Sequence, residues 1–475
     1  MISKLICDQL MNLGFLTNRC EFAVPKRYSG NGELAFAVIG CVLWFSAIVI
    51  RLGFSSKPWT LTEKLVEATS FVVFAALPIL FLATYEGAEL ARRVLLRNSG
   101  LWFQTATCLL LGVYISVVKL LGLNPARFGW LNQFDRLIIQ DSFWLNVILF
   151  LLGAFVVLRL PFVMLGLRDR KPHGFKPPTL LSTIKQNSQL TFLLVANFIY
   201  FSLVHTSLIS TAFKAEYSGY FIGLAYILIA ILLVSPLVTP SATRMTVFDL
   251  LLTGACLLSL FCFSRPFFSF GPFIGLTLFV LVVIFGTRLG REHFGYSFQI
   301  RKADVFYTVK AILAAALILV PLALLLRFTQ PQASTFNLPT IAHSVLFFLS
   351  YAILFGFRVG LFEEILFRSG LMVFIRDQIQ ARSPLQRDRK RLVLLSAVIG
   401  SIIFGLCHIG NEPGAGIALS PFQYKAIYAA LATLASMFYA LAFGETNRLW
   451  ASITIHGIVD TIAVLLLGAS LVVPF

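Results

Sequence analysis

Charged residues are scarce in this sequence. Of its 475 residues only 12% are charged, whereas 58% are hydrophobic, and the mean hydropathy is +0.86. A soluble domain carries roughly 25% charged residues, so the composition excludes an ordinary soluble fold and indicates a polytopic membrane protein. Acidic residues are fewer than basic residues, with 21 Asp and Glu against 38 Lys and Arg. Because the basic residues fall mainly between apolar segments, their excess indicates membrane orientation and not nucleic acid as a partner.

Sequence signals of several other protein classes are missing as well. The seven cysteines show no C-x-x-C spacing, which argues against a disulfide framework or a zinc cluster. The first residues lack the pattern of a removable signal peptide, and the last residues carry no prenylation cysteine. No internal repeat is visible, which weakens the case for a transporter built from two related halves.

Long apolar runs are what the sequence has in abundance. At about 20 apolar residues per crossing, they predict an all-α, polytopic transmembrane helix bundle with about 13 crossings. The expected helices cover residues 34–54, 66–85, 101–123, 142–161, 188–210, 218–238, 247–264, 269–287, 306–327, 341–360, 392–409, 425–443 and 449–472.

A polar stretch at residues 288–304 is the best candidate for a domain boundary. We predict a cytoplasmic or interfacial segment at 1–33, an N-terminal transmembrane region of unassigned role at 34–287, and a C-terminal domain at 288–475. Lys and Arg are concentrated in every second loop, so the positive-inside rule predicts a cytoplasmic N-terminus and an outside C-terminus. The predicted location is the plasma membrane of a prokaryote.

Two adjacent glutamates and an arginine stand out in the apolar C-terminal part. A charge in hydrocarbon costs at least ~2.5–3.5 kcal/mol on insertion scales, so such groups are functional candidates. On a helix, Glu364 lies beside Arg368, four residues on, while Glu363 points about 100° away. We therefore expect Glu364 and Arg368 to pair and Glu363 to stay free for acid–base chemistry.

Two histidines and an aspartate complete the set of polar candidates. His408 ends an apolar helix, whereas His456 and Asp460 are four residues apart at the start of the last helix, with the small Gly457 leaving room beside them. Counted along the helices, His408 lies about 16 residues and His456 about 7 residues from the inside, a depth difference of roughly 13 Å. A tilted or earlier-starting helix, or a re-entrant segment at 410–421, would each remove this mismatch.

These residues resemble the motifs of a known family. E-E-x-x-x-R, F-x-x-x-H and H-x-x-x-D, in this order, resemble the CPBP family of intramembrane proteases, which includes type II CAAX prenyl endopeptidases and bacteriocin-processing, immunity and lysostaphin-resistance proteins. Residues 439–456 are similar to the family's glycine-containing helix, short turn and tryptophan. The resemblance covers roughly residues 300–475 and leaves the N-terminal part unexplained.

The resemblance implies a role for each motif residue. Glu363 and His408 would activate a water molecule, and His456 with Asp460 would stabilise the oxyanion. The supporting residues would be Glu364, Arg368 and Phe404. The family commonly has Asn where this chain has Asp460. An ionised Asp cannot donate to an oxyanion, so we expect Asp460 to hold His456 as an imidazolium donor.

The same residues leave other chemistry open. Glu363, His408 and His456 could form a three-ligand zinc site, since imidazole and carboxylate suit that metal. The glutamate-type mechanism needs no cofactor and is favoured, because the chain has no H-E-x-x-H motif. The leading hypothesis is an endopeptidase whose partners are membrane lipid and a protein or peptide substrate. The alternatives are a multi-helix transporter or proton-coupled carrier, and a catalytically silent immunity or scaffold membrane protein.

Overall fold

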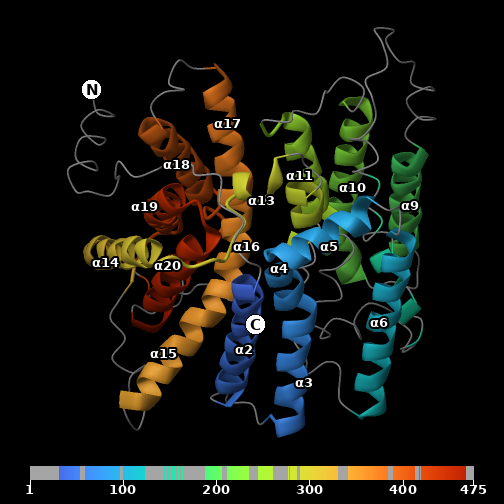
Figure 1. Ribbon diagram of the computed structural model, residues 1–475, viewed down its shortest axis with the longest axis horizontal. Coiled ribbons are helices and arrows are strands. Elements are labelled where there is room, and N and C mark those ends of the chain that lie inside the picture. The colour runs from blue at the N-terminus through green and yellow to red at the C-terminus, as the bar shows by residue number, and fades with distance from the viewer. Residues whose placement is uncertain are drawn as a thin grey trace. The chain divides into compact units, whose positions relative to one another are not determined.

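Helices make up every regular element of the residues that the computed structural model describes (Figure 1). Those residues are 31–53, 59–96, 100–122, 188–205, 211–234, 244–259, 279–285, 289–329, 341–382, 389–411 and 419–466, with scattered positions between 144 and 163, at 276–277 and at 417. The predicted all-α class is confirmed.

Four helices within the described residues are long and apolar enough to cross a membrane. They are Glu33–Gly53, Lys302–Leu325, Ala342–Arg382 and Pro421–Thr446, and five shorter apolar helices accompany them. The chain is thus an integral membrane protein. The predicted number of about 13 crossings is not confirmed, and the crossing expected at 142–161 lies mostly outside the described residues.

The described helices fall into two compact units. The first unit contains α2 (Asn31–Gly53), α3 (Leu61–Phe71) and the helices from α13 (Gly290–His293) onward, of which Gly290 itself falls in the second unit. The second unit contains α4 (Leu77–Leu82), most of α5 (Tyr85–Leu96), α6 (Gly100–Leu120), α9 (Ser188–Val204), α10 (Thr211–Val234), α11 (Val247–Ser259) and the π-helical turn η5 (Val280–Phe285). The predicted boundary near residue 288 stays a prediction, while α2 and α3 group with the C-terminal helices.

Within the second unit, α10 packs against both α9 and α11. The buried Asn197 of α9 donates its side-chain amide to the Phe221 carbonyl of α10 at 3.1 Å. Such a bond replaces the water that is missing in hydrocarbon and fixes the two helices together.

In the first unit, helix α19 (Pro421–Thr446) lies between α14 (Lys302–Leu325), α18 (Arg389–Leu406) and α20 (Leu449–Thr461). Its start is well specified, because Ser420 and Gln423 form a capping box and Pro421 occupies the first turn. Its end is set by Asn447, which adopts a left-handed conformation with φ 50° and lets the chain turn into α20.

One continuous helix carries the adjacent glutamates, and 41 of its residues, Ala342–Arg382, form a candidate membrane span. It consists of α15 (Ile341–Phe355), the π-helical turn η7 (Gly356–Gly360), α16 (Leu361–Glu364), the π-helical segment η8 (Ile365–Met372) and α17 (Val373–Arg382) (Figure 1). The crossing expected at 341–360 therefore does not end there. At 1.5 Å per residue the helix is about 60 Å long, roughly twice the thickness of a hydrocarbon core. π-Helical turns occur often at functional sites, and here they flank both sides of α16.

Two glycines let the helices of this unit approach closely. A Cβ on Gly457 of α20 would lie 2.5 Å from the Ala352 carbonyl oxygen and 2.7 Å from the Gly356 nitrogen. A Cβ on Gly405 of α18 would lie 2.4 Å from the Ala429 carbonyl oxygen of α19. Small residues at such crossings bring backbones together, so Gly457 sets the spacing between α20 and the long helix, and Gly405 that between α18 and α19.

Candidate active site

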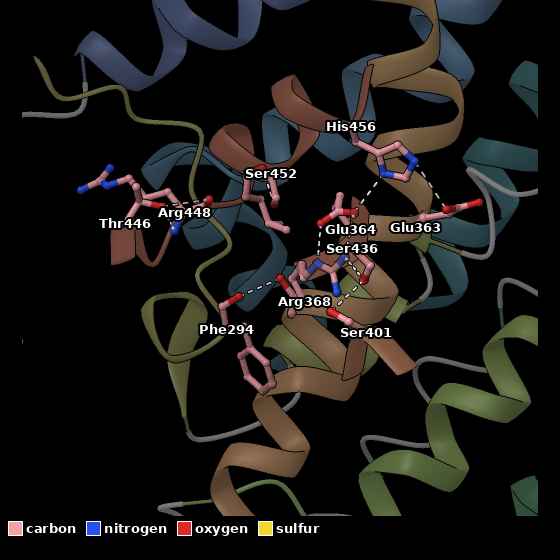
Figure 2. Close-up of polar contacts among 12 residues, drawn as sticks. Phe294, Glu363, Glu364, Arg368, Ser401, Ser436, Thr446, Arg448, Ser452 and His456 are labelled. Carbon is pink, nitrogen blue, oxygen red and sulfur yellow. Dashed lines mark hydrogen bonds and ion pairs between the residues drawn. The ribbon is translucent and has the colours of Figure 1, made fainter. Parts of the chain in front are cut away.

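Glu364 contacts both Arg368 and His456 (Figure 2). Arg368 donates to it from Nε at 2.7 Å and from Nη2 at 3.3 Å, and Nδ1 of His456 lies 2.9 Å from its Oε1. Both Glu364 and Arg368 have fully buried side chains. The structure has the Glu364–Arg368 pair that the spacing predicts, whereas sequence reasoning missed the contact between Glu364 and His456.

Two buried serines extend this group. Nη2 of Arg368 donates to the Ser436 hydroxyl at 2.9 Å, and Ser436 donates to the Ser401 hydroxyl at 3.1 Å (Figure 2). Ser436 comes from α19 and Ser401 from α18, so a single polar chain joins four helices. Sequence reasoning missed both serines. Their only signal is a small polar residue on an otherwise apolar helix, which is too common to assign.

Glu363 has different surroundings from those of its neighbour. Its side chain is 21% exposed, and its Oε2 lies 3.6 Å from Nε2 of His456 but forms no hydrogen bond within the described residues. The Oδ2 of Asp460 lies 3.4 Å from the same nitrogen. Glu363, His456 and Asp460 therefore converge, with His456 in the middle and carboxylates at both of its ring nitrogens.

The rings of His408 and His456 both lie next to the Phe404 ring. The His408 ring centroid lies 4.7 Å from that of Phe404, and the Phe404 centroid lies 5.9 Å from that of His456. The two histidines are therefore closer than the depth difference of about 13 Å that residue counting along straight helices predicts. His408 and Glu363 also interact electrostatically. The residue count overestimates the separation of the two histidines because it carries no information on helix tilt.

The ring nitrogens of His408 differ in what they can do. Nδ1 lies 2.8 Å from the Phe404 carbonyl oxygen, which can only accept a hydrogen bond. Nδ1 must therefore carry a proton, and in the neutral ring Nε2 keeps its lone pair. The structure thus orients His408 as a base at Nε2.

Aromatic rings enclose the polar atoms. The Tyr439 ring stacks on that of His456 with centroids 4.6 Å apart and planes 18° apart, and the Arg368 guanidinium lies 5.6 Å from the Phe404 centroid. Phe404 is 2% and Tyr439 1% exposed. These rings keep water away from Arg368 and fix the plane of His456, which strengthens the local electrostatic interactions.

The residues present do not fit a metal site. Within the described part of the chain, no group of three or more His, Cys, Asp or Glu side chains is arranged to hold a metal ion. His456 faces carboxylates at both nitrogens, which suits a doubly donating imidazolium and leaves no lone pair for a metal.

Comparison with known protein families gives a match to residues 345–462. This segment matches the family model of the type II CAAX prenyl endopeptidases, Rce1-like. The match supports the resemblance of these residues to the CPBP family. The CPBP segment, as we call residues 345–462, contains every candidate site residue, namely Glu363, Glu364, Arg368, Phe404, His408, His456 and Asp460. The match supports a CAAX-type membrane protease in general, while no curated protein and no solved structure matches the chain.

Proposed function

We propose that this protein is an intramembrane endopeptidase that hydrolyses peptide bonds of membrane-associated proteins or peptides. The convergence of Glu363, His456 and Asp460 supports the proposal, because one Glu363 oxygen forms no hydrogen bond within the described part of the chain and can accept a proton. The family match makes peptides ending in a CAAX motif the first substrate class to test.

In the proposed reaction Glu363 and His408 activate water. Glu363 takes a proton from a water molecule, with the Nε2 lone pair of His408 as a second acceptor, while the water oxygen attacks the peptide carbonyl carbon. The C–N bond then breaks, and the abstracted proton passes to the leaving amine, so one water is consumed per bond. General base catalysis of this kind contributes about 10²–10⁴-fold to a rate.

His456 is the proposed donor to the oxyanion. Glu364 and Asp460 together offset its positive charge, so an imidazolium can persist there before substrate binds. A preorganised donor stabilises the negative charge that develops on the carbonyl oxygen without reorganisation. Asp460 thereby acts by holding His456 and does not itself donate.

The proposed mechanism uses no cofactor. Exhaustive chelation of divalent cations is therefore expected to leave the cleavage rate of the purified protein unchanged. A loss of activity that zinc restores, and magnesium does not, would contradict this part of the proposal.

Cleavage by purified protein in proteoliposomes is the test of function. A membrane-anchored peptide with a C-terminal CAAX motif, and the same peptide without it, are incubated in ¹⁸O-labelled water, and the new carboxyl terminus is analysed by mass spectrometry. We expect label in the product with the wild type and none with a Glu363→Ala, His408→Ala double variant. Proton-coupled uptake without any cleavage would instead indicate a transporter, and partner binding retained by an inactive wild type would indicate a scaffold.

The proposal also includes the orientation of the chain in the membrane. With a cytoplasmic N-terminus in the plasma membrane of a prokaryote, the C-terminal end of α18 faces outward. The exposed Cys407, as the only cysteine of a variant, is then expected to react with an impermeant thiol reagent added outside intact cells. Reaction only after the cells are opened would reverse the orientation.

A further inference from the structure

Helices α2 and α3 lie outside the CPBP segment, yet they contact the π-helical turn that precedes Glu363. The Trp44 ring of α2 stacks on the Phe357 ring of η7, with centroids 5.1 Å apart and planes 14° apart. Trp44 is 1% exposed, so this contact is made in the interior of the first unit. Stacked aromatic pairs contribute beyond the area they bury, and the contact fixes η7 against α2.

Charges from both N-terminal helices surround the next residue of the turn. The Arg358 guanidinium lies 5.6 Å from the ring centroid of Phe71 of α3, and it interacts electrostatically with Glu67 of α3 and Arg51 of α2. Glu67 is 6% exposed. In this low-dielectric setting the attraction between Glu67 and Arg358 is much stronger than in water. Glu67 and Phe71 are four residues apart and share a face of α3, so the carboxylate lies on the side of α3 that Arg358 approaches.

The other side of the same turn faces His456. A Cβ on Gly360 would lie 3.3 Å from the Cβ of His456, and a Cβ on Gly356 would lie 3.5 Å from the Ile453 carbonyl oxygen. The turn η7 therefore fits between α2 and α3 on one side and α20 on the other. Because α16 follows directly, a displacement of η7 moves Glu363 relative to His456.

A second contact ties α2 to the far side of α16. Glu33 of α2 pairs with Arg291 at 3.0 Å, and three residues later the Phe294 carbonyl accepts a hydrogen bond from Ser369 of η8 at 2.7 Å. The N-terminal helix is thereby connected to both π-helical segments that flank the two glutamates.

We propose that α2 and α3 position the catalytic segment, with Glu67 as a positioning residue that acts through Arg358. This inference assigns a role to helices that the family match does not cover, and it rests on the proposed peptidase function. Glu67 and Arg358 do not touch substrate. They hold η7 at the register in which Glu363 faces His456.

Kinetics of paired variants test the proposal. We expect Glu67→Gln to lower kcat about tenfold with little change in KM, because substrate binding does not involve Glu67. Glu67→Asp keeps the charge and is expected to recover part of that loss. Arg358→Gln is expected to have the same effect as Glu67→Gln, and the double variant to be no worse than either, since coupled residues are not additive. A hundredfold loss in the double variant, or unchanged kcat in the single ones, would overturn the proposal.

Glu63 provides a matched control in the same helix. It is as buried as Glu67, but it belongs to the capping box with Thr60. Because Gln also serves in a capping box, Glu63→Gln is expected to keep kcat within about twofold of the wild type. An equal loss in Glu63→Gln and Glu67→Gln would assign the effect to α3 stability and would overturn the role of Glu67.

A readout that needs no activity separates this inference from the proposed function. Backbone hydrogen exchange of residues 356–364 is measured in proteoliposomes. We expect Glu67→Gln to accelerate exchange there about tenfold, without a change in α19, and Glu63→Gln to leave it unaltered. If the wild type cleaves no peptide, the peptidase proposal fails. The exchange measurement then still tests whether Glu67 fixes the position of η7. Equal exchange in wild type and Glu67→Gln would end the inference.

Discussion

The two faces of α16 hold adjacent carboxylates in different surroundings. On one face Glu364 is fully buried and accepts from Arg368, which in turn bonds Ser436, while His456 contacts it as well. On the other face Glu363 is partly exposed, and one of its oxygens lacks a hydrogen bond within the described residues. Among the two carboxylates, Glu363 is thus the one with an oxygen that can still accept a proton, whereas both oxygens of Glu364 already accept hydrogen bonds.

The contrast also shows how a membrane protein can keep a reactive acid stable. On the Glu364 face, two charges of opposite sign and a shared histidine offset much of the cost of burial. On the Glu363 face, a partly exposed carboxylate keeps one oxygen without a hydrogen bond within the described residues. His456 belongs to both faces, because Nδ1 contacts Glu364 and Nε2 faces Glu363.

The largest expected effect on stability comes from removing the Glu364–Arg368 ion pair. Arg368→Met leaves the buried Glu364 charge without its cation, and we expect the free energy of unfolding to fall by about 3–5 kcal/mol. Unfolding in mixed micelles measures the loss. Arg382→Met, at the exposed end of the same long helix, is the control and should change stability by less than about 0.5 kcal/mol. Equal behaviour of the two variants would mean that the pair contributes little.

A smaller loss of stability is expected when a larger side chain pushes α20 away from the long helix. The new Cβ of Gly457→Ala would overlap the backbone at Ala352 and Gly356, so α20 must shift. Overpacking of this kind costs about 2–3 kcal/mol, and kcat should fall because His456 moves with its helix. The control is Gly219→Ala in α10, where a Cβ meets nothing within 4 Å. There a slight gain in stability is expected, and a loss equal to that of Gly457→Ala would refute the packing argument.

The smallest effect is expected at the end of the polar chain. Ser436→Ala removes one bond to Arg368 and should lower the free energy of unfolding by about 1–2 kcal/mol. Ser396→Ala removes an equally buried hydroxyl that bonds a carbonyl of its own helix, so a smaller loss is expected from the same measurement. Similar losses in both variants would show that Ser436 does not support the ion pair.

Local spacing explains what could be predicted from the sequence. Apolar runs predict α2, α14 and α19 within a few residues, because a helix satisfies its own backbone in hydrocarbon. The four-residue spacing predicts the contacts of Glu364 with Arg368 and of His456 with Asp460. The roles of these residues in catalysis stay predictions.

Contacts between separate helices could not be predicted from the sequence. Glu364 and His456 are 92 residues apart, and Ser401 and Ser436 are 35 residues apart, so no local pattern links them. The helix end expected at residue 360 was wrong for a related reason. The charges that follow suggest the membrane surface, but Glu364 and Arg368 pair with each other and bond side chains of α19 and α20, and the helix continues through them to Arg382.

The most direct test of the central claim compares Glu363→Gln with Glu364→Gln in one experiment. For each variant, turnover of a membrane-anchored peptide is measured per folded molecule, together with the free energy of unfolding. Glu363→Gln should lower kcat by about 10²–10⁴-fold and change stability by less than about 1 kcal/mol. Glu364→Gln should instead lower stability by about 3–5 kcal/mol, because Arg368 loses its buried counter-charge. Unimpaired turnover in Glu363→Gln, or the same pattern in both variants, would contradict the account.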